Sequence, residues 1–476
     1  MTAAPARRLR AHWLLALLLL GGAVLRVLAQ LAYRPALLYI DSFRYLDDLG
    51  VFFPGGINPI GYEVLLLGPL LLVGNLALVV AVQHLLGLAL GVAIYALLLR
   101  FGARRWIAAL AAAPVLLDAY QVQIEHNIMS DLLFQVLLLA SIAVLTWRGA
   151  PGPRTAAIAG LLLAASVLVR LVGLTLVVPA VVFVLLATGL RPREGWRPRL
   201  RAAGALAGAF AGVLLCYATY HLIWTGTPAL GGSTGSVVYG RTAAVARCDE
   251  LGLTAEEAVV CPREPVAVRA ERGIDFYIHF WHVPVNTDRL PEGFDLNAAQ
   301  SGVARKVLLH QPFDVLGGFL NDFLKGFAPT RTQSPGDVPL ARWQFTTDYP
   351  MYADPWYVAE WAELHGDGTV HADPRLGGLL RDYQLGGGYT PGLALGGCLL
   401  VSAAAVLGAG RARRSGLRAV VLLPAGLATT VLATAAAMEF SWRYQLPGLV
   451  LLPLAAGLAI TAITGPRRPR SSESIT

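Results

Sequence analysis

The chain has 476 residues, of which 56% are hydrophobic and only 14% are charged, and its mean hydropathy is +0.58. Soluble domains carry about 25% charged residues, so this composition excludes an ordinary soluble protein and indicates an integral membrane protein. The net charge of +8 comes mostly from arginines that gather between apolar segments. Such clusters are typical of membrane topology, and no nucleic-acid partner is expected.

The apolar segments predict an all-α polytopic membrane protein with about ten transmembrane helices, because each span needs about 20 apolar residues. In chain order, the predicted spans are residues 11–33, 76–99, 105–118, 131–147, 154–171, 173–189, 202–223, 391–409, 417–437 and 445–464. In the seventh span, Gly204, Gly208 and Gly212 recur every four residues and predict a face for close helix packing. The apolar run that ends at Val73 is short, and we expect it to lie along the interface or to enter the bilayer partly.

Arginine clusters alternate along the chain with acidic, histidine-bearing and aromatic turns. With a cytoplasmic N-terminus, every arginine cluster falls on the cytoplasmic side and every other turn on the outer side, in agreement with the positive-inside rule. The Ala-, Leu-, Val-, Gly- and Arg-rich composition is typical of a GC-rich bacterium. We therefore expect a multi-pass protein of the bacterial plasma membrane, with both termini in the cytoplasm.

Three parts follow from this topology. Residues 1–224 form an N-terminal transmembrane catalytic module with outer loops at 34–74 and 118–131, residues 225–390 form a large extracytoplasmic loop of mixed structure, and residues 391–476 hold the last three spans and a basic cytoplasmic tail. The extracytoplasmic loop has a predicted helical run near residues 298–325. It is expected to cap the outer face, where it either binds the acceptor or has a structural role.

The long loop contains two cysteines, whose pairing depends on whether the loop lies in an oxidising compartment. Cys248 and Cys261 flank a short polar run. In an extracytoplasmic compartment they are expected to pair as a disulfide, and the alternative is two unpaired thiols.

Charged side chains gather at the outer boundary of the membrane, where charge is costly unless it has a task. A carboxylate there can take a proton from an acceptor hydroxyl, and an arginine can hold a lipid phosphate through its planar fork. The catalytic candidates are Asp41 in the first outer loop and Glu125 and Asp131 in the second. The candidates for binding a donor phosphate are Arg170, Arg443 and Arg26, and the further candidates are His126, Asp47, Asp48 and Tyr444.

Each candidate also has a structural interpretation. Asp41 can be a solvated loop acid, and Asp131 can favour the start of the fourth span through the helix dipole. Arg170 and Arg26 can extend along the membrane to the interface, and Arg443 can pair with Glu439 nearby.

Four motifs occur in a fixed order: Asp41-Ser42 followed by Tyr45-Leu46, then Glu125 with Ser130-Asp131-Leu132-Leu133-Phe134, then Val169-Arg170-Leu171-Val172-Gly173-Leu174, and finally Arg443-Tyr444-Gln445-Leu446-Pro447. Their order and sidedness resemble the polyprenyl-phosphate-dependent glycosyltransferases of the GT-C fold, which include protein mannosyltransferase-like, aminoarabinose transferase-like and arabinofuranosyltransferase-like groups. The likeness covers residues 10–190 and 435–465. The run from Gly231 to Gly235, with Val238-Tyr239-Gly240-Arg241-Thr242, Cys248, Cys261 and Pro262 after it, resembles the loop of actinobacterial members.

The resemblance implies an inverting transfer of a sugar from a polyprenyl-phosphate donor to a hydroxyl on the outer face. Asp41 matches the catalytic aspartate of the family, and Arg170 and Arg443 match positions near the lipid phosphate. Many members have a second carboxylate directly after that aspartate, whereas here Ser42 follows. A second carboxylate, and a divalent cation such as Mg or Mn, would therefore depend on Glu125, Asp131, Asp47 or Asp48.

The expected partners are a polyprenyl-phosphate sugar donor, membrane lipids, and an acceptor that is a cell-envelope glycan, a glycolipid or a protein. Two other functions fit the same topology. One is an oligosaccharide polymerase or ligase with a lipid-diphosphate donor, and the other is a lipid or glycan transporter. A transporter favours ionisable groups near the bilayer midplane and broken helices in paired halves, whereas the charges here lie at the outer boundary.

Overall fold

A computed structural model describes residues 11–187, 195–231, 234–279, 290, 292–366 and 368–465. Parts of several expectations fall outside these residues. They concern the N-terminus before residue 11, the end of the predicted sixth span at 188–189, the Gly232-Ser233 part of the glycine-rich run, and the basic tail after residue 465.

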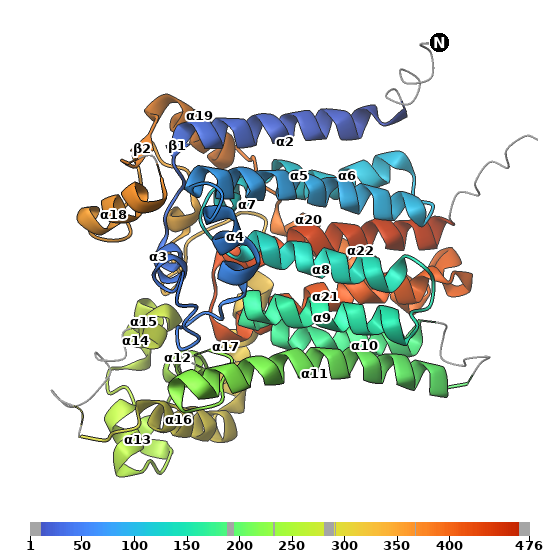
Figure 1. Cartoon of the computed structure of the whole chain (residues 1–476). Coiled ribbons are helices and arrows are strands. Elements are labelled where there is room, and N and C mark those ends of the chain that lie inside the picture. Colours follow the sequence, from blue (N-terminus) through green and yellow to red (C-terminus); the bar gives the residue numbers. More distant parts are fainter. Residues whose placement is uncertain are drawn as a thin grey trace, which may run out of the picture.

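The body of the protein is a bundle of apolar helices that run side by side (Figure 1). Its elements are α2 Trp13–Ala32, α5 Leu76–Arg100, α6 Arg105–Leu117, α7 Ala119–Glu125, α8 Asp131–Thr146, α9 Pro153–Val169, η2 Leu171–Leu176, α10 Val177–Leu186, α11 Arg197–Thr225, α20 Gly392–Leu407, α21 Leu417–Met438, η6 Trp442–Gln445 and α22 Leu446–Thr464.

Helix length and composition confirm an all-helical, polytopic membrane protein. In the described part of the chain, five helices are long and apolar enough to cross a membrane, and α6 with α7 makes a sixth candidate that is bent by 53°. The α8, α9, η2–α10 and α20 segments are shorter apolar helices. Each predicted span therefore coincides with a helix or a broken helix.

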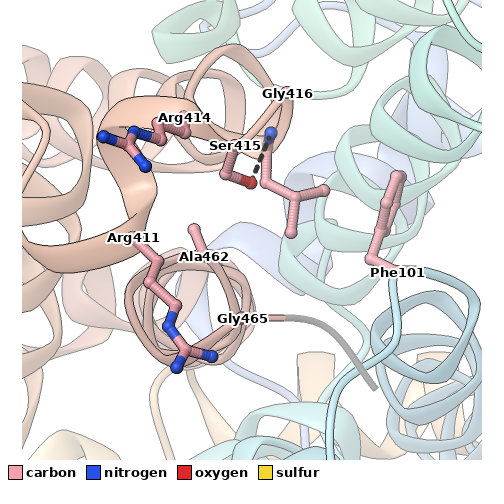
Figure 2. A pocket seen from close by; sticks show the side chains of 8 residues that line it. Phe101, Arg411, Arg414, Ser415, Gly416, Ala462 and Gly465 are labelled. Atoms are coloured by element: carbon pink, nitrogen blue, oxygen red, sulfur yellow. Dashed lines mark hydrogen bonds between the residues drawn. The ribbon is translucent and has the colours of Figure 1, made fainter. Parts of the chain in front are cut away.

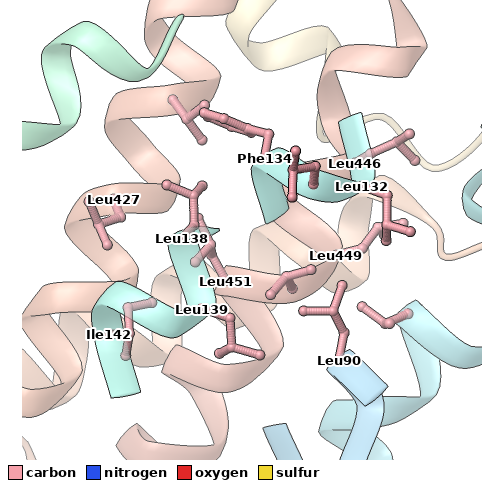
Figure 3. Packing of buried hydrophobic residues seen from close by; sticks show 14 of the residues in the cluster. Leu90, Leu132, Phe134, Leu138, Leu139, Ile142, Leu427, Leu446, Leu449 and Leu451 are labelled. Atoms are coloured by element: carbon pink, nitrogen blue, oxygen red, sulfur yellow. The ribbon is translucent and has the colours of Figure 1, made fainter. Parts of the chain in front are cut away.

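Helix α22 is the centre of the bundle, with contacts to α5, α6, α8, α20 and α21. Its residues Leu446, Leu449 and Leu451 pack among side chains of α8 and α21 (Figure 3). Association inside a bilayer depends on close van der Waals contact more than on the hydrophobic effect. The residues at the start of α22 are therefore held firmly in place.

The second predicted outer loop, residues 118–131, is not a solvated turn. All of these residues are buried, and Ala119–Glu125 forms α7. Asp118 caps α7, since its Oδ1 accepts the N–H groups of Tyr120 and Gln121 at 3.0 and 3.4 Å. The polar side chains of residues 118–131, which predicted a solvent-exposed loop, are instead partners in a buried hydrogen-bond network.

The predicted packing face of the seventh span is not used within the described part of this chain. A methyl group added to Gly204, Gly208 or Gly212 of α11 would meet no other atom within 4 Å, so these glycines do not contact a neighbouring helix. The close approach is made by Gly160 of α9, whose added Cβ would lie 2.3 Å from the carbonyl oxygen of Leu206. The glycine that the packing requires is on the partner helix.

The membrane end that carries α3 (Ile40–Asp47) also carries the helices of the long loop (Figure 1). These helices are α12 Thr234–Ala243, α13 Ala255–Val260, α14 Val266–Arg272, α15 Ile274–His279, α16 Leu296–His310, α17 Pro312–Lys325, α18 Pro355–His365 and α19 Pro374–Leu385, with short η3 Cys248–Glu250 and η4 Leu340–Trp343. The remaining short helices, η1 Glu63–Leu67, α4 Gly68–Leu71 and η5 Gly410–Arg414, connect the spans. The predicted run near 298–325 is thus two helices, which part at Gln311 because Pro312 starts a new one.

The long loop has a small core of its own and is tied to the bundle. Tyr239, Tyr277 and Val303 belong to the core, and Cys248 is joined to Cys261 in the expected disulfide. A two-stranded antiparallel sheet pairs β1 (Tyr33–Arg34), which directly follows α2, with β2 (His371–Ala372). Arg331 and Trp343 of the long loop also donate to Gln445 and Ser441, so the long loop contacts the bundle beside the start of α22.

We expect Gly160→Ala to lower the thermal stability of the purified protein, because the new methyl group would push α9 away from Leu206. Overpacking of this kind costs about 1–3 kcal/mol. The matched variant Gly208→Ala, which adds the same methyl group to α11, should leave the melting temperature within error of the wild type. A thermal-shift measurement in detergent compares the two, and equal melting temperatures would contradict the assigned α9–α11 contact.

Candidate active site

Arg443 joins two carboxylates at the start of the central helix. Its Nη1 donates to Asp41 Oδ2 at 2.7 Å, and its Nε and Nη2 donate to Asp131 Oδ2 at 3.0 and 2.8 Å. Asp131 Oδ1 also pairs with Arg170 Nη1 at 2.7 Å. The structure thus brings together four of the candidate residues, from α3, the start of α8, the end of α9 and η6, and we call them the outer charge cluster.

Asp41 is positioned by contacts between the two outer segments. The N–H of Leu37 donates to the carbonyl of His126 at 3.0 Å, and the N–H of Ile128 donates back to Leu37 at 3.2 Å. Ser42 accepts the N–H of Tyr39 at 2.9 Å, which caps α3, and its hydroxyl donates to the carbonyl of Ile128 at 2.9 Å. Ser42 therefore fixes the start of α3.

Asp131 is positioned by the start of α8 and Arg170 by the end of α9. Ser130 makes no capping hydrogen bond, and its hydroxyl instead bonds the Tyr45 hydroxyl at 2.9 Å. Arg170 has extended backbone angles that end α9, which turns its side chain toward Asp131. The helix-dipole interpretation of Asp131 is compatible with this geometry, but both oxygens of the carboxylate are also bound by guanidinium groups.

The members of the cluster differ in exposure. The side chains of Asp41 and Arg170 are 15% and 16% exposed, whereas those of Asp131 and Arg443 are 5% and 6% exposed. Burial alone would raise the pKa of Asp41, but Arg443, Arg44 and Arg170 lower it below its ordinary value. Asp41 is thus an ionised carboxylate that keeps a small exposed surface.

Arg44 and the aromatic residues above Arg443 complete the site, and sequence reasoning gave Arg44 no role. Arg44 Nη1 donates to Asp41 Oδ1 at 2.9 Å from the next turn of α3. The Trp343 ring lies 5.4 Å from the Arg443 guanidinium, and its Nε1 donates to Ser441 at 3.1 Å. The spacing of three residues between Asp41 and Arg44 is the signal that could have identified this pair.

Glu439 is a second residue whose position the sequence did not reveal. Instead of pairing with Arg443, it accepts the Tyr444 hydroxyl at 2.6 Å on Oε1, and its buried Oε2 has no hydrogen-bond partner in the described part of the chain. Burial and the nearby Asp275 raise its pKa to about 7. Tyr444 in turn lies under Arg170, at 5.7 Å from ring to guanidinium.

Asp47 and Asp48 lie outside the cluster at the end of α3. Asp47 accepts a hydrogen bond from Tyr357 of α18. Burial and the neighbouring Asp47 raise the pKa of Asp48. Neither aspartate contacts Arg443 or Arg170, so the structure gives them no part in the convergence of charges.

Arg26 and Glu125 form a separate, buried network. Arg26 donates to both oxygens of Glu125 at 2.8 Å and to the carbonyls of Gly22, Val115 and Leu116 at 3.1, 3.1 and 2.8 Å. These bonds use all five N–H donors of the guanidinium. Arg26 therefore has no donor left for a lipid phosphate in this structure, and the expectation that it binds one is not supported.

The same network contains two stacked histidines. His84 Nδ1 lies 3.2 Å from Glu125 Oε2, His84 Nε2 lies 3.0 Å from His126 Nδ1, and His126 Nε2 lies 2.9 Å from the carbonyl of Tyr33. The two imidazole rings thus link the Glu125 carboxylate to the backbone of Tyr33.

Glu125 and His126 are closed off from any substrate, because both are fully buried. A methyl group on Gly87 of α5 would lie only 2.2 Å from Glu125 Oε1, which shows how tightly the network is enclosed. In this structure both residues hold α2, α5 and α7 together. The outer charge cluster retains Asp41 and Asp131 as its carboxylates.

The carboxylates of the cluster do not fit a divalent metal site. In the described part of the chain, no group of three or more His, Cys, Asp and Glu side chains gathers in a way that could hold an ion. The oxygens of Asp41 and Asp131 already accept hydrogen bonds from Arg44, Arg170 and Arg443. We therefore derive no step through Mg or Mn.

Comparison with known proteins finds little. No model of a known protein family matches the chain, and no curated protein matches it. Among solved structures, it is similar to the S. cerevisiae protein O-mannosyltransferase Pmt1-Pmt2 complex bound to the sugar donor, at 17% identity and a TM-score of 0.35. The match covers 51% of this chain and 38% of that chain. A likeness at this level does not decide the activity, which has to be inferred from the site.

We expect the buried Glu439 to make the stability of the protein depend on pH. Its pKa in the fold is about 7, above the ordinary 4.5, so its contribution is greatest below pH 4.5 and is lost as the pH rises through 7. The loss amounts to about 3 kcal/mol. In Glu439→Gln the melting temperature should change less over this range.

Thermal-shift measurements from acidic to neutral pH test this expectation. Glu256→Gln, which removes an exposed glutamate of α13, is the matched control and should follow the wild type. Identical pH profiles for wild type and Glu439→Gln would show that Glu439 does not titrate in this range.

We expect Arg26→Met to destabilise the protein strongly, because it leaves the Glu125 carboxylate buried without its partner. Breaking a buried pair in this way costs about 3–5 kcal/mol. Arg26→Met combined with Glu125→Gln removes the uncompensated charge and should recover part of the melting temperature. A double variant less stable than the single one would contradict the structural role of this pair.

Proposed function

We propose that this chain is a membrane glycosyltransferase of the GT-C type. In this proposal it moves a sugar from a polyprenyl-phosphate carrier to a hydroxyl acceptor on the extracytoplasmic face. The observation that carries the proposal is the outer charge cluster, in which an accessible carboxylate, Asp41, shares Arg443 with a second carboxylate, Asp131. The resemblance of the sequence motifs to that family agrees with it.

The charge of the cluster favours an anionic substrate. The guanidinium groups of Arg44, Arg170 and Arg443 face the carboxylates of Asp41 and Asp131, so these five side chains together carry a net charge of +1. A phosphate that bridges Arg170 and Arg443 would balance it through charge-assisted hydrogen bonds. The partial exposure of Arg170 places this guanidinium on the accessible side.

The reaction then requires a base and a leaving group. Asp41 accepts the proton of the acceptor hydroxyl while that oxygen forms a bond to the anomeric carbon of the sugar. The bond from this carbon to the phosphate oxygen breaks, and the electron pair leaves on the polyprenyl phosphate, which Arg170 and Arg443 stabilise. Attack from the face opposite the phosphate inverts the anomeric configuration.

The lowered pKa of Asp41 is compatible with this role. The arginines that lower it also hold it ionised at neutral pH. When the donor phosphate takes over hydrogen bonds from Arg443, Asp41 loses part of that stabilisation and becomes a stronger base. Substrate binding and activation of the base are thus coupled through one guanidinium.

A small apolar pocket of about 30 Å³ lies beside the cluster. Its lining includes Phe323 of α17, Leu395 of α20 and Leu432 of α21, together with Glu439 and Tyr444. On its far side α17 presents an exposed apolar row, Phe313, Leu316, Leu320 and Leu324. Because such a row is stable against acyl chains, we infer that α17 lies at the outer leaflet and that the carrier enters beside it.

We expect Asp41→Asn to abolish sugar transfer, since loss of a general base typically costs about 10²–10⁴-fold in rate. Membranes that contain wild type or variant at equal protein level are offered polyprenyl-phosphate mannose and polyprenyl-phosphate arabinose separately, and transfer of radiolabelled sugar is counted. The matched control is Asp47→Asn, which removes a carboxylate from the same helix outside the cluster. It should retain transfer.

The outcomes separate the parts of the proposal. Equal transfer by wild type and Asp41→Asn would remove Asp41 from the mechanism. Absence of transfer from both monophosphate donors, together with transfer from a lipid-diphosphate sugar, would replace the proposed donor class by that of an oligosaccharide polymerase or ligase.

A further inference from the structure

A pocket of about 420 Å³ lies at the end of the bundle opposite the outer charge cluster. Its walls come from the ends of α5 and α22, from η5 and from the start of α21 (Figure 2). The 19 residues of α22 separate it from Arg443, a rise of about 28 Å. The pocket is therefore independent of the proposed active site.

The polar part of the pocket is positively charged. Arg411 and Arg414 lie on one side of it (Figure 2). Arg411 Nη1 donates to the carbonyl of Thr464 at 3.1 Å, which leaves its other N–H groups available, and Arg414 makes no hydrogen bond or ion pair with any described residue. No carboxylate is among the described residues that line the pocket. Within the described part of the chain, these two guanidinium groups therefore have no anionic partner.

The start of α21 also favours an anionic ligand in this pocket. Ser415 accepts the N–H of Leu417 at 3.1 Å, and its own hydroxyl hydrogen remains available beside the pocket. The N-terminus of a long helix carries partial positive charge and free N–H groups. Arginines, a hydroxyl and a helix N-terminus around one cavity suit a phosphate group.

The other walls are apolar. Phe101 lies on the side opposite the arginines (Figure 2), and Leu417 and Ala462 also line the space. A volume of about 420 Å³ falls within the usual range for small-ligand sites. A ligand that fills it should thus combine an anionic head with an apolar body, as a phospholipid does.

We propose that this pocket binds the phosphate of an anionic phospholipid headgroup. Arg411 and Arg414 hold the phosphate, and the glycerol and first acyl carbons lie against Phe101 and Leu417. Basic pockets between transmembrane helices at the cytoplasmic side are sites of this kind in membrane proteins. The bound lipid joins the ends of α5, α21 and α22, and so stabilises the helix that carries Arg443 at its other end.

Lipid titration followed by native mass spectrometry tests the proposal on the full chain in detergent. The probes are dioleoyl phosphatidylglycerol, dioleoyl phosphatidylcholine and inorganic phosphate. Wild type should bind phosphatidylglycerol in preference to phosphatidylcholine. Arg414→Gln should weaken that binding about tenfold, because it removes a charge-assisted contact; since Arg414 has no partner within the described chain, the fold should not suffer.

The matched control is Arg413→Gln, on the same short helix. Arg413 is exposed and does not line the pocket, so phosphatidylglycerol binding should stay within about twofold of wild type if the contact is specific. Equal weakening by both variants would show diffuse surface charge and overturn the site. Unchanged binding in Arg414→Gln would overturn it as well, and competition by inorganic phosphate at similar concentration would replace the lipid by a soluble phosphate.

Discussion

The pairing of Arg443 with two carboxylates is the interaction that organises the end of the helix bundle that carries α3. A buried guanidinium is tolerated only where its charge and its hydrogen bonds are satisfied, and Arg443 meets this condition through Asp41 and Asp131. These partners come from segments about 310 and 400 residues earlier in the chain. One side chain at the start of the central helix thus fixes α3, α8 and, through Asp131, the end of α9.

A second arginine–carboxylate network lies deeper in the bundle and shows what distinguishes the outer cluster. Arg26 donates all of its N–H groups to Glu125 and to backbone carbonyls, and Glu125 is fully buried. Asp41 is partly exposed, and in its cluster the three arginines outnumber the two carboxylates. Both networks pair arginines with carboxylates, so residue type alone does not tell a structural pair from a candidate site. The exposure of the carboxylate and the balance of charges around it do differ between the two networks.

This difference explains what the sequence predicted and what it missed. The apolar segments are long enough to give the helices, and sidedness alone grouped Asp41, Asp131, Arg170 and Arg443 on one face. Sidedness could not tell that residues 118–131 fold inward as α7, because a polar run is compatible with either water or a buried network. The glycine repeat of α11 shows a similar limit. Its spacing places three glycines on one helix face, but the position of the neighbouring helix decides which face is covered. Here the close contact is made by Gly160 of α9.

The shared guanidinium also suggests why a resting site can hold its base and its phosphate ligands in contact. Without a substrate, Arg443 and Asp41 neutralise each other, and the cost of burying both charges is met by their pairing. A phosphate competes for the same N–H groups and offers more acceptor oxygens than one carboxylate does. Under the proposed function, Arg443 would turn toward the phosphate and keep its Nε contact with Asp131, while Asp41 would lose a partner and gain basicity. The donor would then be a condition for activating the acceptor, and proton transfer would occur only with a sugar in place.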